Sequence, residues 1–154
     1  MVERAGFKSE MTDLHAAIGL RRLADVEANL VVRNRLWKAY DDGFVGSRVV
    51  TPSDVQGGDR HARHLYTIMV DETSTGIGRN ELAFELKKKG IVVGFHYKDP
   101  LCGQPYYQRR LGWKRDDCPL ATAVCDRTMT LPLSPWMTEE HVAEVVSSIR
   151  GIIG

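Results

Sequence analysis

Apolar residues in the first third of the chain recur at intervals of three and four, which is the repeat of an amphipathic α-helix. Thr12 or Asp13 can cap such a helix, because a short side-chain oxygen accepts a hydrogen bond from a free amide of the first turn. The pattern predicts one long helix, or two helices broken near Gly19, ending at about Asp42–Gly43. The apolar stripe consists of Leu14, Ala17, Ile18, Leu23, Val26, Leu30, Trp37 and Tyr40.

The middle of the chain alternates between strand-forming and helix-forming segments. His64–Asp71 is rich in residues that favour strands and is predicted as a central strand, with Ile91–Tyr97 as a second buried strand. Between them, Glu81–Lys89 is predicted as a helix that Gly90 ends in a left-handed conformation. The lysines in its last turn suit the carbonyl end of the helix dipole, so we interpret them as helix-end electrostatics and not as a ligand site.

The end of the chain has the cleanest helical pattern. Thr138 is predicted to cap a helix whose first turn carries two glutamates and whose apolar residues form one face. Few strands interleaved with helices predict the α/β class, in the form of a small α+β domain that spans residues 1–154. We expect a long N-terminal helix, a small antiparallel or mixed sheet covered on one face by helices, and an amphipathic C-terminal helix.

Composition narrows the function classes without naming one. A length of 154 residues allows one core, and a net charge of +1 leaves no basic footprint for nucleic acid or an anionic membrane. Cys102, Cys118 and Cys125 lack the spacing of a zinc site, so we expect reduced thiols and no metal. Neither a signal peptide nor a membrane-spanning run is apparent, which favours a cytoplasmic protein.

Candidate chemistry concentrates where the second predicted strand gives way to a loop punctuated by proline. His96 and Tyr97 lie at this strand end, and Gln104, Tyr106 and Tyr107 follow. The pair can face a ligand, but a His-Tyr pair at a strand end is more often a packed, hydrogen-bonded structural element. The sequence shows no set of nucleophile and base with a readable spacing and no glycine-rich phosphate loop, so no catalytic residue is predicted.

Three segments occur in the order found in the C-terminal part of the DegT/StrS-type sugar aminotransferases, which the chain resembles. They are Gly6–Gly19, then Gly90–Tyr97 running on to Gln104–Tyr107, then Leu131–Pro135 followed by Thr138. The resemblance implies a fold type I pyridoxal-phosphate enzyme that exchanges a keto group on a nucleotide-linked sugar for an amino group, usually with glutamate as donor. It also implies a homodimer.

The resemblance assigns roles to individual residues. Lys8 and Ser9 would reach the cofactor phosphate of the partner subunit, while Glu10 belongs to the N-terminal region of the helix. His96 and Tyr97 would line the substrate pocket for the nucleotide-linked sugar. Cys102 stands where many relatives have histidine, and Ser134 fills the variable slot of a Leu-Pro-Leu-x-Pro motif that we take to be structural.

In this family the lysine that binds the cofactor covalently belongs to a large domain that precedes the resembling part, and Lys38, Lys98 and Lys114 do not match its motif. We therefore expect the large domain to be absent, no pyridoxal phosphate on this chain alone, and no transamination by it. Exposed apolar surface on the first helix predicts self-association. Two alternatives stay open: part of a family sugar dehydratase, and a stand-alone non-catalytic interaction module or the remnant of a broken gene.

Overall fold

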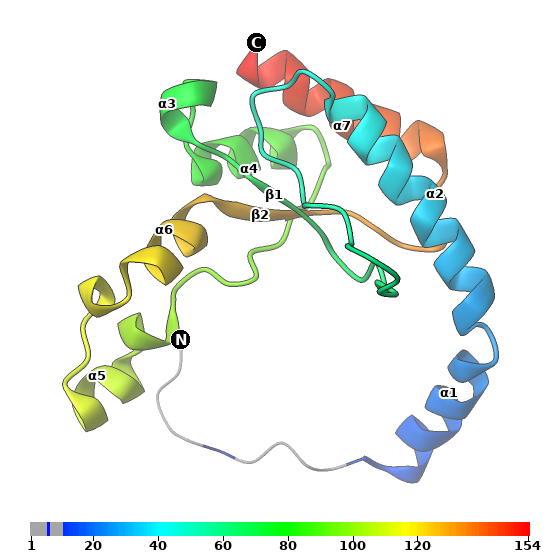
Figure 1. The fold of residues 1–154 in the computed structure, drawn as a ribbon, viewed down its shortest axis with the longest axis horizontal. Coiled ribbons are helices and arrows are strands. Elements are labelled where there is room, and N and C mark those ends of the chain that lie inside the picture. Colours follow the sequence, from blue (N-terminus) through cyan, green and yellow to red (C-terminus); the bar gives the residue numbers. More distant parts are fainter. Residues whose placement is uncertain (1–5, 7–10) are drawn as a thin grey trace.

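The computed structural model describes residue 6 and residues 11–154. A two-stranded antiparallel sheet lies at the middle of these residues, in which β1 (Tyr66–Met69) pairs with β2 (Thr128–Leu131) (Figure 1). Tyr66 lies opposite Leu131. Isolated bridges continue the pairing on both edges, from Val50 to Met69 and from Gly94 to Thr130. The prediction of a small sheet covered on one face by helices is confirmed.

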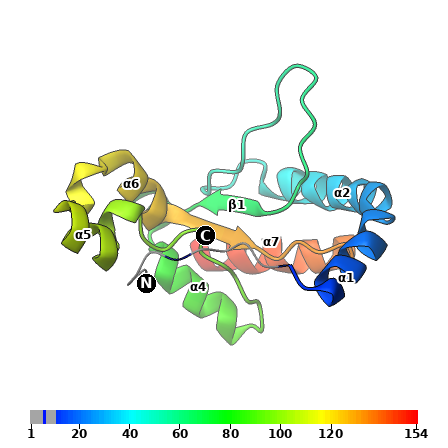
Figure 2. The same ribbon diagram turned by 90° about the horizontal axis from the view of Figure 1, so that it is seen from below.

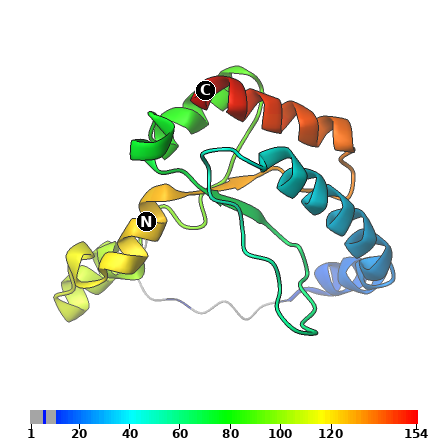
Figure 3. The same cartoon turned by 45° about the horizontal axis from the view of Figure 1, so that its top comes forward.

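The core lies on one face of the sheet. Side chains alternate along a strand, so Tyr66 and Ile68 point to one face while Thr67 points to the other. The apolar face packs under α2 (Val26–Phe44), α4 (Arg79–Lys88) and α7 (Glu139–Ile153), which gather on one side of the strands in Figures 1 and 3. The opposite face carries threonines, and it is the side on which a site can form.

The C-terminal helix α7 matches its prediction closely. Thr138 is the N-cap, and its backbone N–H donates to Nδ1 of His141 at 3.0 Å. Arg150 in the last turn donates to the carbonyls of Gly43 and Val45 at 2.9 and 2.6 Å, which ties α7 to the end of α2. The buried residues of the predicted face are Val142, Val145, Val146, Ile149 and Ile153.

The apolar stripe in the first third of the chain forms two helices, which is one of the two predicted arrangements. Thr12 caps α1 (Asp13–Leu23) by accepting from the amide of His15 at 3.3 Å. The break lies at Ala24 and Asp25, so the prediction of a break near Gly19 is wrong. A single glycine is tolerated inside a helix, whereas aspartate favours helix ends; Asp25 is the N-cap of α2, and its carboxylate pairs with Arg21 at 3.1 Å.

One predicted strand is wrong. Of Ile91–Tyr97, only Gly94 pairs with the sheet, through amide-to-carbonyl bonds of 2.9 and 2.8 Å with Thr130. The second strand is instead β2, for which the sequence predicted no element and of which only Leu131 belongs to the Leu131–Pro135 motif. Met129 and Leu131 of β2 are almost fully buried, so packing of this segment against the core selects it over Ile91–Tyr97, although the composition of Ile91–Tyr97 also favours a strand.

The helices α5 (Pro105–Leu111) and α6 (Pro119–Arg127) form a lobe at one end of the molecule, away from α2 (Figure 2). The short helix α3 (Glu72–Thr75) lies near α4 instead (Figure 1), and short 3-10 turns occupy Leu101–Gly103 and Arg115–Asp117. Proline opens both α5 and α6, at a position where its missing N–H costs nothing. Within residues 11–154 no helix has the length and apolar character needed to cross a membrane.

Candidate functional site

The polar face of the sheet holds the first candidate residue, His96. Its Nδ1 lies 2.9 Å from Oγ1 of Thr130, and that oxygen lies 3.2 Å from Oγ1 of Thr67. The three side chains therefore form a connected hydrogen-bond chain across both strands and the bridged segment. Neither threonine was predicted as a site residue. The alternation in β1 could have indicated Thr67, but the contact of Thr130 depends on a pairing that the sequence does not reveal.

Gly94 makes room for the imidazole of His96. A Cβ atom built on Gly94 would lie 2.9 Å from Cε1 of the His96 ring, closer than real Cβ contacts come. The absence of a side chain at position 94 lets the backbone pair with Thr130 while the ring lies over it. The requirement for glycine at position 94 of the Gly90–Tyr97 motif thus has a specific steric reason.

Tyr97 completes the surface that His96 begins. The two rings meet edge to face with their centroids 5.9 Å apart, and Tyr97 is 73% exposed. No hydrogen bond to another described residue engages the Tyr97 hydroxyl or the Nε2 atom of His96. The pair therefore offers an aromatic face and free polar atoms to a ligand.

Cys102 lies away from this surface. Its side chain is 1% exposed, and its thiol donates to the carbonyl of Arg115 across 3.6 Å. A hydrogen bond with that thiol raises the pKa of Cys118, and burial raises the pKa of Cys125, so neither favours a thiolate. The three cysteines form no disulfide. The described residues include no His, Cys, Asp and Glu group suited to a metal ion.

Lys8, Ser9 and Glu10 lie outside the described residues, so their roles stay predictions. The lysines among residues 11–154 are all exposed. A bond with Asp42 at 2.8 Å raises the pKa of Lys38, and Lys88 pairs with Glu85 at 2.6 Å. A lysine that forms an imine has to lose its proton, which burial promotes and solvent exposure does not. The described lysines therefore do not fit as a covalent anchor for pyridoxal phosphate.

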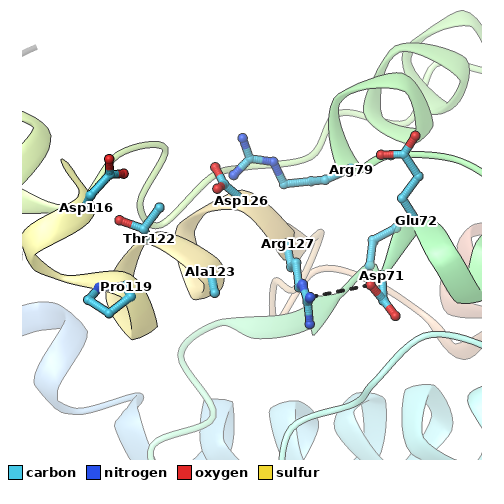
Figure 4. A pocket seen from close by; sticks show the side chains of 11 residues that line it. Asp71, Glu72, Arg79, Asp116, Pro119, Thr122, Ala123, Asp126 and Arg127 are labelled. Atoms are coloured by element: carbon cyan, nitrogen blue, oxygen red, sulfur yellow. Dashed lines mark ion pairs between the residues drawn. The ribbon is translucent and has the colours of Figure 1, made fainter.

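A charged pocket of about 500 Å³ lies between the end of β1, the starts of α3 and α4, and α6 (Figure 4). Its ionisable side chains are four carboxylates and two guanidinium groups, which belong to Asp71, Glu72, Asp116, Asp126, Arg79 and Arg127. Excess negative charge opposes a phosphate-bearing cofactor or a nucleotide-linked sugar. This pocket does not fit the anionic ligands that the resemblance implies.

The charged side chains of this pocket form ion pairs and hydrogen bonds that connect neighbouring helices and loops. Asp71 pairs with Arg127 at 3.6 Å and accepts hydrogen bonds from Thr73 and Ser74, which lower the pKa of Asp71. Arg79 is only 6% exposed and donates to the carbonyl of Cys125, which joins α4 to α6. The guanidinium of Arg79 also lies 4.6 Å above the Phe95 ring centre. We interpret the pocket as a structural network.

Comparison with known proteins places this fold among aminotransferases. The model of the DegT/DnrJ/EryC1/StrS aminotransferase family matches residues 1–150. Spore coat polysaccharide biosynthesis protein SpsC of Bacillus subtilis (strain 168) is 35% identical over 153 residues, which cover 99% of this chain and 39% of SpsC.

Solved structures agree with the sequence relatives. Spr1654 of Streptococcus pneumoniae, a putative sugar aminotransferase, matches in its PLP-form with a TM-score of 0.82 and 32% identity, over 92% of this chain and 36% of Spr1654. A DegT DnrJ EryC1 StrS aminotransferase from Brucella abortus has a TM-score of 0.77 and 26% identity, over 99% of this chain and 38% of its own. The chain thus spans less than two fifths of each of these relatives, and it belongs to the DegT/DnrJ/EryC1/StrS aminotransferase family.

Proposed function

We propose that this chain is the C-terminal portion of a pyridoxal-phosphate-dependent aminotransferase that acts on nucleotide-linked keto sugars. One observation carries the proposal: the family model covers residues 1–150, yet the chain spans 39% of SpsC and 36% of Spr1654. The exposure of every lysine in residues 11–154 supports the further proposal that the chain does not transaminate alone. The PLP-form of Spr1654 supports the same cofactor in the complete enzyme.

In the complete enzyme, this chain would supply part of the substrate wall. His96 and Tyr97 stand on the sheet face that the helices α2, α4 and α7 leave uncovered, with Nε2 and the phenol hydroxyl available to a ligand. Hydroxyl-rich sugars bind well to a surface that combines an aromatic ring with hydrogen-bonding atoms. We assign both residues to substrate binding, not to the chemical step.

Lys8 and Ser9 would contact the cofactor phosphate of the partner subunit, which makes the proposed enzyme a homodimer. A lysine ammonium is a compact charge with several donors and suits a phosphate. The cofactor itself supplies the carbonyl that carries the amino group between donor and sugar. The chain's own part is to hold the phosphate and the sugar in place.

The test is to produce the chain together with the large domain of the complete enzyme and to assay amino transfer from glutamate to a nucleotide-linked keto sugar. Mass spectrometry of the sugar distinguishes the outcomes. Amination by the combined protein and none by the chain alone is expected. Loss of a sugar hydroxyl in place of amination would identify a dehydratase, and an inert combined protein that binds no cofactor would identify a non-catalytic module. Either result would overturn the proposal.

A further inference from the structure

We infer that Thr130, assisted by Thr67, is a positioning residue that fixes the imidazole of His96 with Nε2–H directed at a ligand oxygen. The inference deepens the proposed function and rests on it only for the identity of the ligand, a sugar with hydroxyl or carbonyl oxygens. The hydrogen-bond chain itself is a property of the described residues.

Thr130 is a rigid support for the ring. Its side chain is 5% exposed, and its backbone bonds to Gly94 in both directions at 2.8 and 2.9 Å. The branched side chain of threonine has few rotamers, and β2 already pairs with β1 on its other edge. Oγ1 of Thr130 is therefore held at a fixed point, 2.9 Å from Nδ1 of His96.

The backbone below the ring limits where His96 can go. A Cβ atom at Gly94 would lie 2.9 Å from Cε1 and 3.4 Å from Nδ1, so the imidazole lies directly over this glycine. Rotation of the ring would break the bond to Thr130. The structure thus selects one orientation, in which Nδ1 faces the sheet and Nε2 is left without a partner among the described residues.

The protons of the three side chains are linked. Each hydroxyl has one proton to donate, so donation from Thr67 to Thr130 leaves the Thr130 hydroxyl free to donate to Nδ1 of His96. Nδ1 is then the acceptor of the neutral ring and Nε2 carries the proton. Neutral imidazole side chains in water favour this same form, so the network and the intrinsic preference agree. His96 therefore presents a donor, which matches an oxygen acceptor on a sugar.

The first experiment reads the protonated nitrogen directly. The chain is labelled with ¹⁵N in histidine, and long-range proton–nitrogen spectra are recorded at a pH of about 8.5, two units above the ordinary pKa of histidine. The His96→Gln variant assigns the signals. We expect Nδ1 of His96 at the shift of a nitrogen without a proton and Nε2 at the shift of a protonated one.

Matched variants separate positioning from structure. Thr130→Val keeps the shape and removes the hydroxyl, so the two nitrogen shifts should move toward each other as the tautomers mix. Thr130→Ser should keep the wild-type nitrogen shifts. Thr67→Val should give nitrogen shifts between those of the wild type and Thr130→Val. Because Thr67 is less buried than Thr130, this variant keeps the test valid if Thr130→Val fails to fold. A protonated Nδ1 in the wild type, or unchanged shifts in both valine variants, would overturn the inference.

The role toward substrate is tested separately in the complete enzyme. Thr130→Val should raise KM about tenfold with kcat little changed, since one hydrogen bond to substrate is weakened. Thr130→Ser should restore KM. If the nitrogen shifts move as expected and KM does not, the positioning of His96 stands and its assignment to substrate is wrong. Amino transfer by the wild type, measured in the same assay, tests the proposed function independently.

Discussion

At the scale of single residues, Tyr40 connects helix α2 to the segment after β2. Its ring is fully buried, its hydroxyl donates to the carbonyl of Pro132 at 2.7 Å, and burial raises the pKa of Tyr40. Tyr40→Phe removes this donor from a partly buried carbonyl, so urea unfolding should show a loss of about 1–2 kcal/mol. Tyr97→Phe is the control, because an exposed hydroxyl should matter by less than about 0.5 kcal/mol. Equal losses of unfolding free energy in both variants would show that the hydrogen bond from Tyr40 to Pro132 does not stabilise the fold.

Asp71 gives the molecule a pH-dependent contact. Hydrogen bonds from Thr73 and Ser74 lower the pKa of Asp71 below its ordinary value of 3.8. A lowered folded-state pKa means that this stability is present above 3.8 and is lost as the pH falls through the folded-state value. Asp71→Asn should therefore unfold with a weaker dependence on pH below about 4 than the wild type does.

The measurement is the free energy of unfolding in urea across a series of acidic buffers. Asp59→Asn is the matched control, since Asp59 lies on an exposed loop and its carboxylate bonds to no other described residue. That variant should follow the wild-type curve. If the free energy of unfolding of Asp71→Asn depended on pH as steeply as that of the wild type, the contacts of Asp71 with Thr73 and Ser74 would not stabilise the fold.

The candidate site could be predicted from the sequence only in part. His96 and Tyr97 emerged because an imidazole and a phenol stand together after an apolar run. Thr67 and Thr130 did not, because their meeting depends on an antiparallel pairing between segments 63 residues apart. Cys102 lies in the same loop as the candidates, yet its thiol points into the protein toward Arg115. Lys8 and Ser9 stay predictions.

At the scale of elements, two helical glycines should respond in opposite ways to alanine. A Cβ at Gly43 in α2 would lie 2.9 Å from a methyl of Val146 in α7, whereas a Cβ at Gly19 in α1 would meet nothing within 4 Å. Gly43→Ala should destabilise the fold by about 1 kcal/mol, because the stiff valine has to shift and this outweighs the gain in helix propensity. Urea unfolding measures the change.

Gly19→Ala should strengthen α1 by about 0.5–1 kcal/mol, since alanine loses less backbone freedom in a helix. Amide hydrogen exchange within α1 should slow, because α1 buries no side chain and its stability is local. A stabilising Gly43→Ala would show that the packing of α2 on α7 is looser than the structure indicates. Faster exchange in Gly19→Ala would contradict the helical environment of Gly19 in α1.

Helices with a strong period and a clear cap were predictable, and so was β1, which lies within the predicted strand His64–Asp71, but β2 and the short helices were not. The apolar face of α7 and its Thr138 cap specify that helix locally. Ile91–Tyr97 has the composition of a strand, but Val92 is exposed and only Gly94 pairs. Tertiary packing chose β2 instead, and strand formation depends on such packing more than on composition. The helices α5 and α6 begin at prolines, which resemble loop punctuation in a sequence.

At the scale of the whole molecule, α1 leaves apolar surface uncovered. None of its residues is buried, and the exposed ones include Leu14, Ile18, Leu20 and Leu23. We expect self-association in solution, because uncovered apolar surface of this kind favours a second protein surface over water. The double variant Leu14→Glu with Ile18→Glu should shift the mass from light scattering toward the 17.3 kDa of one chain.

The control for this prediction is Leu120→Glu. Leu120 is 83% exposed on α6, at the opposite end of the molecule, so its replacement should leave self-association unchanged. A wild-type chain that scatters as a monomer at high concentration would contradict the prediction. So would a double variant that associates as strongly as the wild type.

Under the proposed function, this chain would carry part of a substrate wall and not the covalent anchor for the cofactor. The most direct test is to mix the chain with pyridoxal phosphate, reduce with borohydride and locate any pyridoxyl-lysine by peptide mass spectrometry. Exposed lysines should give only scattered adducts far below one per chain, and the mixture should show no defined imine absorbance. One lysine modified in stoichiometric yield would show a covalent anchor for the cofactor on this chain and would contradict this assignment.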